Sequence, residues 1–91
     1  MDTISKIIRN IITEIKPGYF FDAHFVISKL IEEHSDEYLK GYTEGTTASY
    51  HGRLAQMIKG FEGELVEQQD GMSWSKNINN NYSECSLWKR V

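Results

Sequence analysis

Isoleucine recurs at three- and four-residue steps through the first fifteen positions. One face of a helix would collect Ile4, Ile7, Ile8, Ile11, Ile12 and Ile15. Polar side chains occupy the opposite face. A stripe this regular predicts a buried scaffold helix. Pro17 and Gly18 end it, because proline moves the residue before it out of the helical region and glycine lets the chain turn.

The apolar pattern then shortens. Tyr19 to Phe21 predicts one short strand, and Asp22 is placed to cap a second helix. The inward face of that helix carries Val26, Ile27, Leu30 and Ile31. From Ser35 onward the chain either continues this helix or forms a short separate helix that ends at Gly41. The polar stretch from Tyr42 to Thr46 predicts a surface connection.

A third helix is predicted from Thr46 to Phe61. Its narrow apolar stripe consists of Leu54, Ala55, Ile58 and Phe61, Thr46 or Thr47 caps its start, and Gly60 and Gly63 can end it. The remaining faces carry hydroxyl, aromatic, amide and basic side chains and no acid. Such a surface offers hydrogen-bond donors to an anionic partner, and nucleic acid is the commonest such partner.

The last third of the chain favours strands. Ser73 to Ile78 and Tyr82 to Trp88 predict a hairpin whose tip, Asn79 to Asn81, consists of residues that tolerate positive φ. Before it, Glu64 to Glu67 predicts a brief strand and Asp70-Gly71 a chain reversal. Trp74 and Trp88 are assigned to the core. The predicted fold class is therefore mainly α with a small β-hairpin (α+β), with three helices in a single domain over residues 1–91.

The net charge and its distribution along the chain limit which partners the protein can attract. The net charge is −3, which opposes sequence-independent attraction to phosphates. The acids gather in residues 32–37 and 62–70, whereas the third helix has only the basic residues Arg53 and Lys59. A modest positive patch would survive if that helix and the hairpin shared a face. Cys85 has no cysteine partner, and the chain shows neither a secretory signal nor a long apolar run, so a cytoplasmic location without membrane contact is expected.

The order of predicted elements is scaffold helix, short strand, second helix, connection, presented helix and hairpin. This order, with the character of Thr46 to Lys59 and of Lys76 to Asn81, resembles the winged helix-turn-helix family over nearly the whole chain. The resemblance implies that the presented helix enters the major groove of DNA and that the hairpin, the wing, lies against the backbone or minor groove. The connection from His34 to Ala48 is longer than the turn of ~3–4 residues in the simple motif.

The resemblance also assigns roles to residues. Base reading falls on Ser49, Tyr50, Arg53 and Gln56, since Arg53 suits guanine and Gln56 suits adenine. Phosphate contacts fall on Thr46, Thr47 and Ser49 at the helix start, where free N–H groups favour an anion. Lys59 adds a positive charge on the same helix. The wing contributes Lys76, Asn77, Asn79, Asn80 and Asn81. Tyr50 has a second reading, in which its ring packs against the second helix and its hydroxyl stays in water.

Other chemistry is disfavoured. His24, His34, His51 and Cys85 lack the spacing of a metal site, and no acid has a base or nucleophile beside it, so we expect no metal, no cofactor and no enzymatic activity. The predicted function is double-stranded DNA binding by a small transcriptional regulator. The alternative is a protein-interaction module on the same fold. A small domain offers limited contact area, so a homodimer or a protein partner is expected, through the outward face of the first helix or Lys89 to Val91.

Overall fold

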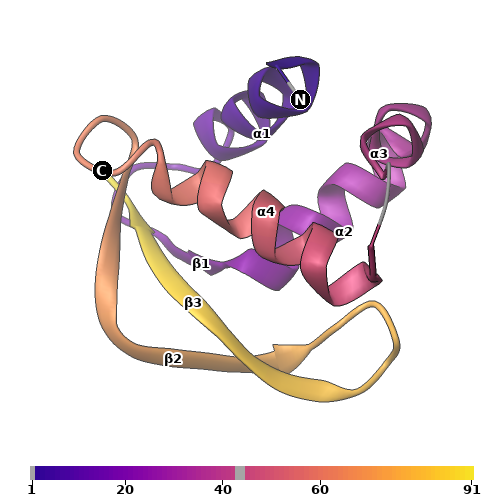
Figure 1. The fold of residues 1–91 in the computed structure, drawn as a ribbon. Helices are drawn as coiled ribbons and strands as arrows, with labels where there is room; N and C mark the ends of the chain where they lie inside the picture. Colours follow the sequence, from indigo (N-terminus) through magenta and orange to yellow (C-terminus); the bar gives the residue numbers. More distant parts are fainter. Residues whose placement is uncertain (1, 43–44) are drawn as a thin grey trace.

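The computed structural model describes residues 2–42 and 45–91, and over these it contains four helices and three strands. In chain order they are α1 (Asp2–Thr13), β1 (Phe20–Asp22), α2 (Ala23–Glu33), α3 (Ser35–Gly41), α4 (Thr47–Lys59), β2 (Val66–Lys76) and β3 (Tyr82–Arg90). In Figure 1 the hairpin of β2 and β3 runs beneath α4. Thr43 and Glu44 of the predicted connection lie outside the described residues.

The protein is an α+β domain with a three-stranded antiparallel sheet. The strand order is β1-β3-β2, so β3 lies in the middle and pairs with both neighbours. β1 is the short strand expected at Tyr19 to Phe21, shifted by one residue to end at Asp22. The strand thus closes the sheet on the side where α2 begins.

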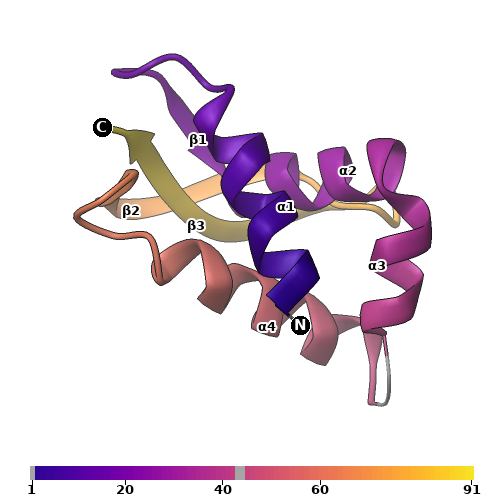
Figure 2. The same cartoon turned by 90° about the horizontal axis from the view of Figure 1, so that it is seen from above.

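The helix count of three was wrong. Residues Ser35 to Gly41 form the separate helix α3, and His34 stands between α2 and α3 with φ −139° and ψ 46°. That conformation is not helical, so the helical path breaks there and α3 takes a new direction (Figure 2). The described residues therefore contain four helices.

The predicted reversal at Asp70-Gly71 was also wrong. β2 continues through these residues, and its register against β3 shifts between Gln68 and Met72. Gly71 has φ +80°, the left-handed conformation that glycine adopts without strain. Asp-Gly therefore makes a β-bulge here, because both sides of it pair with the same distant strand.

The scaffold prediction for α1 is confirmed. Ile4, Ile8, Ile11 and Ile12 are buried, and Ile7 and Ile15 pack partly buried against the same core. The helix ends at Thr13, before Pro17. α2 contributes Ala23, Val26, Ile27 and Leu30 to this core, and α4 contributes Tyr50, Leu54 and Ile58. One apolar cluster therefore joins the helices to the inner face of the sheet.

The two tryptophans have opposite environments. Trp88 is 1% exposed and belongs to the core, as predicted, whereas Trp74 is 65% exposed and the prediction for it was wrong. Successive side chains of a strand point to opposite faces. Ser73 and Ser75 face the start of α2, where they meet Asp22 and His24, so Trp74 between them faces solvent.

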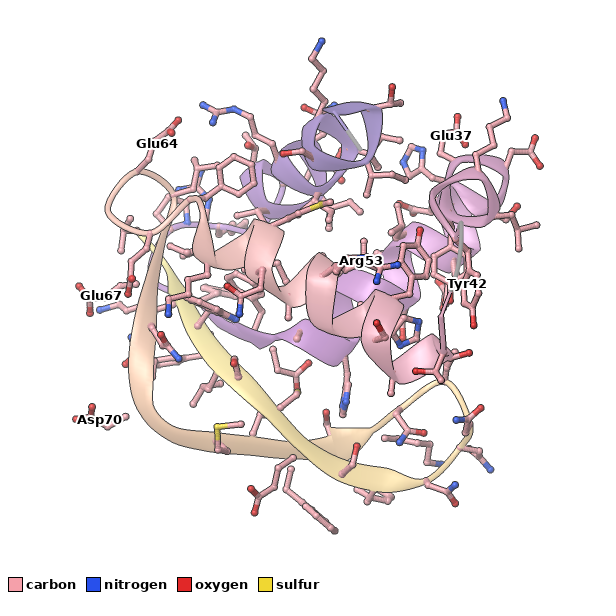
Figure 3. All side chains as sticks on the ribbon, viewed as in Figure 1. Glu37, Tyr42, Arg53, Glu64, Glu67 and Asp70 are labelled. Carbon is pink, nitrogen blue, oxygen red and sulfur yellow. The ribbon has the colours of Figure 1, made fainter. Side chains whose placement is uncertain are left out.

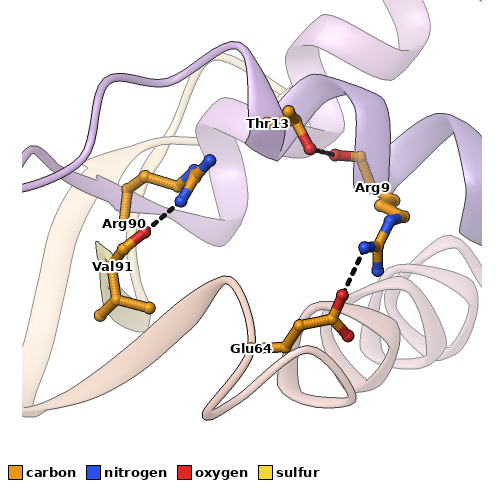
Figure 4. Close-up of polar contacts among 5 residues, drawn as sticks. All are labelled: Arg9, Thr13, Glu64, Arg90 and Val91. Carbon is orange, nitrogen blue, oxygen red and sulfur yellow. Dashed lines mark hydrogen bonds and ion pairs between the residues drawn. The ribbon is translucent and has the colours of Figure 1, made fainter.

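The C-terminal residues belong to the folded domain. Arg90 Nε donates to the Ile12 carbonyl oxygen (3.1 Å), and Val91 N donates to the Leu65 carbonyl oxygen (2.9 Å). Figure 4 shows a further hydrogen bond from Arg90 to the Val91 carbonyl oxygen and the ion pair of Arg9 with Glu64. Residues 89–91 thus tie the sheet to α1.

Replacing Ile8 with aspartate tests the scaffold role of α1. Ile8 is fully buried, and a carboxylate there would have no partner, so Ile8→Asp should cost about 4 kcal/mol or more and unfold most of the protein at 25 °C. Thr3→Asp adds the same charge on the exposed face of the first turn and should leave the melting temperature nearly unchanged. Circular dichroism melts measure both. A cooperative melt of Ile8→Asp at the parent temperature would contradict the scaffold role.

Candidate nucleic-acid interface

The helix α4 starts with the cap that the sequence predicts. The Thr46 hydroxyl accepts a hydrogen bond from Ser49 N (3.1 Å). Thr46 is therefore the cap of the helix, and its hydroxyl is already engaged. The exposed side of α4 carries small or polar residues, namely Ala48, Ser49, Gly52, Gln56 and Lys59.

Tyr50 does not belong to that exposed side. Its side chain is fully buried, and its hydroxyl donates to the Tyr38 carbonyl oxygen (2.6 Å). The Tyr38 and Tyr42 rings lie 5.1 and 5.0 Å from the Tyr50 ring, centroid to centroid. Burial, together with Tyr38, raises the pKa of Tyr50 against the opposing effect of Arg53. The predicted base contact by Tyr50 is therefore excluded in this fold, and its hydroxyl is not in water either.

Gly41 lets α3 end against this tyrosine. A Cβ atom at position 41 would lie 2.6 Å from the Tyr50 hydroxyl oxygen, closer than real contacts allow. Glycine is thus required for the close approach of α3 to α4. The position of the first turns of α4 follows from this contact.

Arg53 lies along the helix. Its Nη1 donates to Ser49 Oγ (3.1 Å), and its guanidinium carbon is 5.6 Å from the centroid of the Tyr50 ring. Both contacts are with residues of α4 itself. Ser49 and Arg53, which were predicted to read bases, are therefore hydrogen-bonded to each other in the free protein. Gln56 and Lys59 lie farther along the exposed side of the helix.

A groove separates α4 from the hairpin tip. This hollow of about 410 Å³ lies between one side of α4, the start of α2 and the end of the hairpin. Its lining includes Thr47, His51, Asn77, Asn79 and Ser83. The structure thus brings Thr47 together with two of the predicted wing residues. Ser49, Arg53, Gln56 and Lys59 do not line the groove.

The asparagine tip forms as predicted, with unequal roles for its residues. Asn77 Oδ1 accepts from Asn79 N (2.9 Å) and Asn81 N (3.2 Å), and Asn77 Nδ2 donates to Ser83 Oγ (3.1 Å). Asn80 has φ 66°, in the left-handed region. Asn77 therefore builds the turn, and a partner can reach the exposed side chains of Asn79, Asn80 and Asn81.

Serines hold the hairpin against α2. Ser73 Oγ donates to Asp22 Oδ2 (2.6 Å), and Ser75 Oγ lies 2.7 Å from His24 Nδ1. Burial opposes ionisation of Asp22, but hydrogen bonds from Ser73, Phe25 N and Ser75, with nearby His24, keep the pKa of this carboxyl below its ordinary value. The alternation of serines along the strand was the signal for this polar face, which the sequence analysis did not identify.

The acidic residues lie away from Arg53. In Figure 3, Glu64, Glu67 and Asp70 follow the outer edge of β2 and the turn before it, on the far side from Arg53. Glu64 is paired with Arg9, and Glu62 accepts a hydrogen bond from Gln68 N (3.3 Å). The acidic run 62–70 therefore adjoins the C-terminal end of α4 and leaves its N-terminal half free of these charges.

Two further features emerge only in three dimensions. Gly52 lies inside α4, yet apart from the helix's own backbone no atom of the described residues comes within 4 Å of a Cβ built there.

On the outer face of the hairpin the Trp74 and Tyr82 rings stack with centroids 6.3 Å apart, and Lys76 Nζ lies 5.8 Å from the Tyr82 centroid. The sequence signal for the first feature was a glycine in the middle of a predicted helix. The signal for the second was the alternation of aromatic residues along the strands.

Comparisons with protein-family models, with curated proteins and with solved structures gave no match. The function must therefore be inferred from these residues. None of the helices in the described part of the chain is long and apolar enough to cross a membrane.

The stability of the joint between α3 and α4 should depend on pH through His51. Its Nε2 lies 2.7 Å from the Tyr38 hydroxyl, and burial, with nearby His24, lowers its pKa. Because the folded state then binds fewer protons than the unfolded state, the free energy of unfolding should fall as the pH drops below about 6.5. His51→Gln should remove this fall, whereas His34→Gln should keep it. Urea titrations at several pH values measure the difference, and an equal fall in His51→Gln would refute the assignment.

Proposed function

We propose that this protein is a winged helix that binds double-stranded DNA, as a small cytoplasmic transcriptional regulator, with α4 in the major groove and the β2–β3 hairpin as the wing. The element order and the strand order β1-β3-β2 support this architecture, with α3 inserted before the recognition helix. The observation that carries the proposal is the joint exposure of the N-terminal half of α4 and the hairpin tip at the two sides of one groove.

The DNA contacts divide between the two elements. Free N–H groups in the first turn of α4 suit a phosphate, and Gln56 suits an adenine edge in the major groove. Lys59 supplies charge from α4, and Lys76, Asn79 and Asn80 supply donors from the wing. Tyr50 and Asn77 do not contact DNA in this proposal. Tyr50 positions α4, and Asn77 positions the wing tip.

Arg53 remains the candidate for reading guanine. To reach a base it must leave the Ser49 hydroxyl and the Tyr50 ring. An exposed cation–π contact of this kind is worth only about 0.5–1 kcal/mol, whereas a bidentate pair with guanine discriminates by about 1–3 kcal/mol. Both contacts that Arg53 must leave are weak contacts within α4, so its resting position is compatible with a reading role.

Salt dependence tests the phosphate contacts. Fluorescence anisotropy with random-sequence duplex DNA should show binding at low salt that weakens as salt rises, because Arg53, Lys59 and Lys76 supply the few cations of α4 and the hairpin. Lys76→Gln should reduce the slope of log K against log salt by about 1. Lys6→Gln removes the same charge from the exposed face of α1 and should leave the slope unchanged. Equal slopes for the two variants would contradict the role of the wing.

Gly52→Ala separates stability from binding. Alanine is favoured over glycine inside a helix by about 1 kcal/mol and meets no neighbour in the described residues, so the variant should melt at a higher temperature. If α4 lies close to DNA, the added methyl group should weaken binding severalfold despite the gain in stability. Melting curves and anisotropy measure the two effects. Unchanged DNA affinity in the stabilised variant would show that this side of α4 does not approach DNA.

The second candidate is a protein-interaction module without DNA binding. The exposed Trp74 and Tyr82 on the outer face of the hairpin favour it, since exposed aromatic residues are enriched in protein interfaces. The same titration decides between the two functions. Absence of DNA binding even at low salt would favour the protein-interaction module.

A further inference from the structure

A separate apolar surface lies beside β1, where this strand meets the start of α2 and the residues that follow α1. Phe21 and Trp88 pair across β1 and β3 and are buried, so Phe20 and Leu87, which alternate with them, face the other way. A hollow of about 690 Å³ on this face is lined by Ile15, Tyr19, Phe20, Phe25 and Leu87 together with polar residues. We call it the β1 surface.

The aromatic side chains of the β1 surface are unusually open. Tyr19 and Phe20 are each 61% exposed, and Phe25 is 41% exposed. Together these three expose roughly 300 Å² of mostly apolar area, the size of the largest apolar patch on a typical monomer. The Trp74–Tyr82 stack differs, because that cross-strand pair stabilises the hairpin that carries it. No comparable pairing among the described residues accounts for Tyr19, Phe20 and Phe25.

We propose that the β1 surface binds a second copy of this chain and forms a two-fold symmetric dimer. The charges at its rim favour a second copy over a strongly charged partner. Glu14 and Asp22 lie among the residues of the hollow with Lys16, and Lys89 pairs with Phe20 across the sheet. In a two-fold interface each patch meets itself, so a rim of both signs allows opposite charges to face each other.

The exposed area of the β1 surface also agrees with binding of a second copy of this chain. A stable interface buries about 800 Å² on each side, with aromatic anchors at its centre and a polar rim. The three aromatic residues would supply more than a third of that area, and Ile15 and Leu87 adjoin them. Contacts along Lys16 and Lys89 would add the remainder, because lysine stems cover apolar surface while their ammonium groups stay in water.

The position of the β1 surface leaves the groove free. No residue that lines the groove also lines the β1 surface. In Figure 2, β1 and α4 lie on opposite sides of the view, and Figure 1 shows α1 above both. Two copies joined through the β1 surface would therefore present two separate grooves. This dimer goes beyond DNA binding and does not depend on it.

Sedimentation equilibrium over a wide concentration range tests the dimer. The parent should approach twice the monomer mass at high micromolar concentration, and Phe20→Thr should weaken association at least about tenfold, because an aromatic anchor is lost while strand propensity is kept. Trp74→Thr is the matched control, since Trp74 is also an exposed aromatic residue in a strand, and it should associate like the parent. A cooperative melt of each variant would show that both fold, with Trp74→Thr melting somewhat lower because it loses the stack with Tyr82.

Three outcomes would overturn the dimer. They are a parent that stays monomeric at every concentration, a dimer that survives Phe20→Thr, and a dimer that Trp74→Thr weakens as much as Phe20→Thr does. Salt separates this proposal from DNA binding, because apolar association persists in salt that abolishes phosphate contacts. A monomer that binds DNA refutes the dimer alone, and a dimer that fails to bind DNA refutes the DNA proposal alone.

Discussion

The burial of Tyr50 is the contact on which the rest of the groove depends. A tyrosine hydroxyl taken out of water must find a partner, and here the partner is the carbonyl oxygen of Tyr38 at the middle of α3. The bond forms only because Gly41 allows the end of α3 to approach the ring. One aromatic side chain thus determines where α3 ends and where α4 begins.

The opposite wall of the groove depends on the start of α2. Asp22 accepts from Phe25 N, which caps α2, and from Ser73, which holds β2. His24, two residues later, lies 2.7 Å from Ser75. A single turn of α2 therefore fixes the hairpin, while the core face of the same helix packs on α1 and α4. The distance between α4 and the hairpin therefore follows from contacts that converge on α2.

Local patterns in the sequence were enough for the features that local contacts determine. The isoleucine stripe of α1, the caps Asp22 and Thr46 and the asparagine tip all involve residues close together in the chain, and all are present. Tyr50, Trp74 and Asp70-Gly71 were misassigned because distant partners decide their roles. Tyr50 bonds to Tyr38 of α3. The serines on either side of Trp74 face α2, and the strand that contains Asp70-Gly71 pairs with β3. Of the candidate site, the helix and the wing could be predicted, whereas the engagement of Arg53 with Ser49 and the groove itself required the fold.

The distribution of charge limits how strongly this domain can attract an anionic partner. Its net charge of −3 gives little general attraction to DNA, and Glu84 lines the groove, although the paired Glu64 and the outer acids of β2 lie away from it. In the proposed DNA complex, the attraction would come from a few cations outside the groove lining, so close fit would have to supply much of the binding free energy. Close fit is also the contribution that discriminates between sequences. A single copy with few phosphate contacts would bind weakly, and joining two copies multiplies the contacts without adding a charge to either. In the proposed dimer, the acidic composition and the open apolar surface away from the groove would thus be consistent features of a domain that gains affinity by pairing.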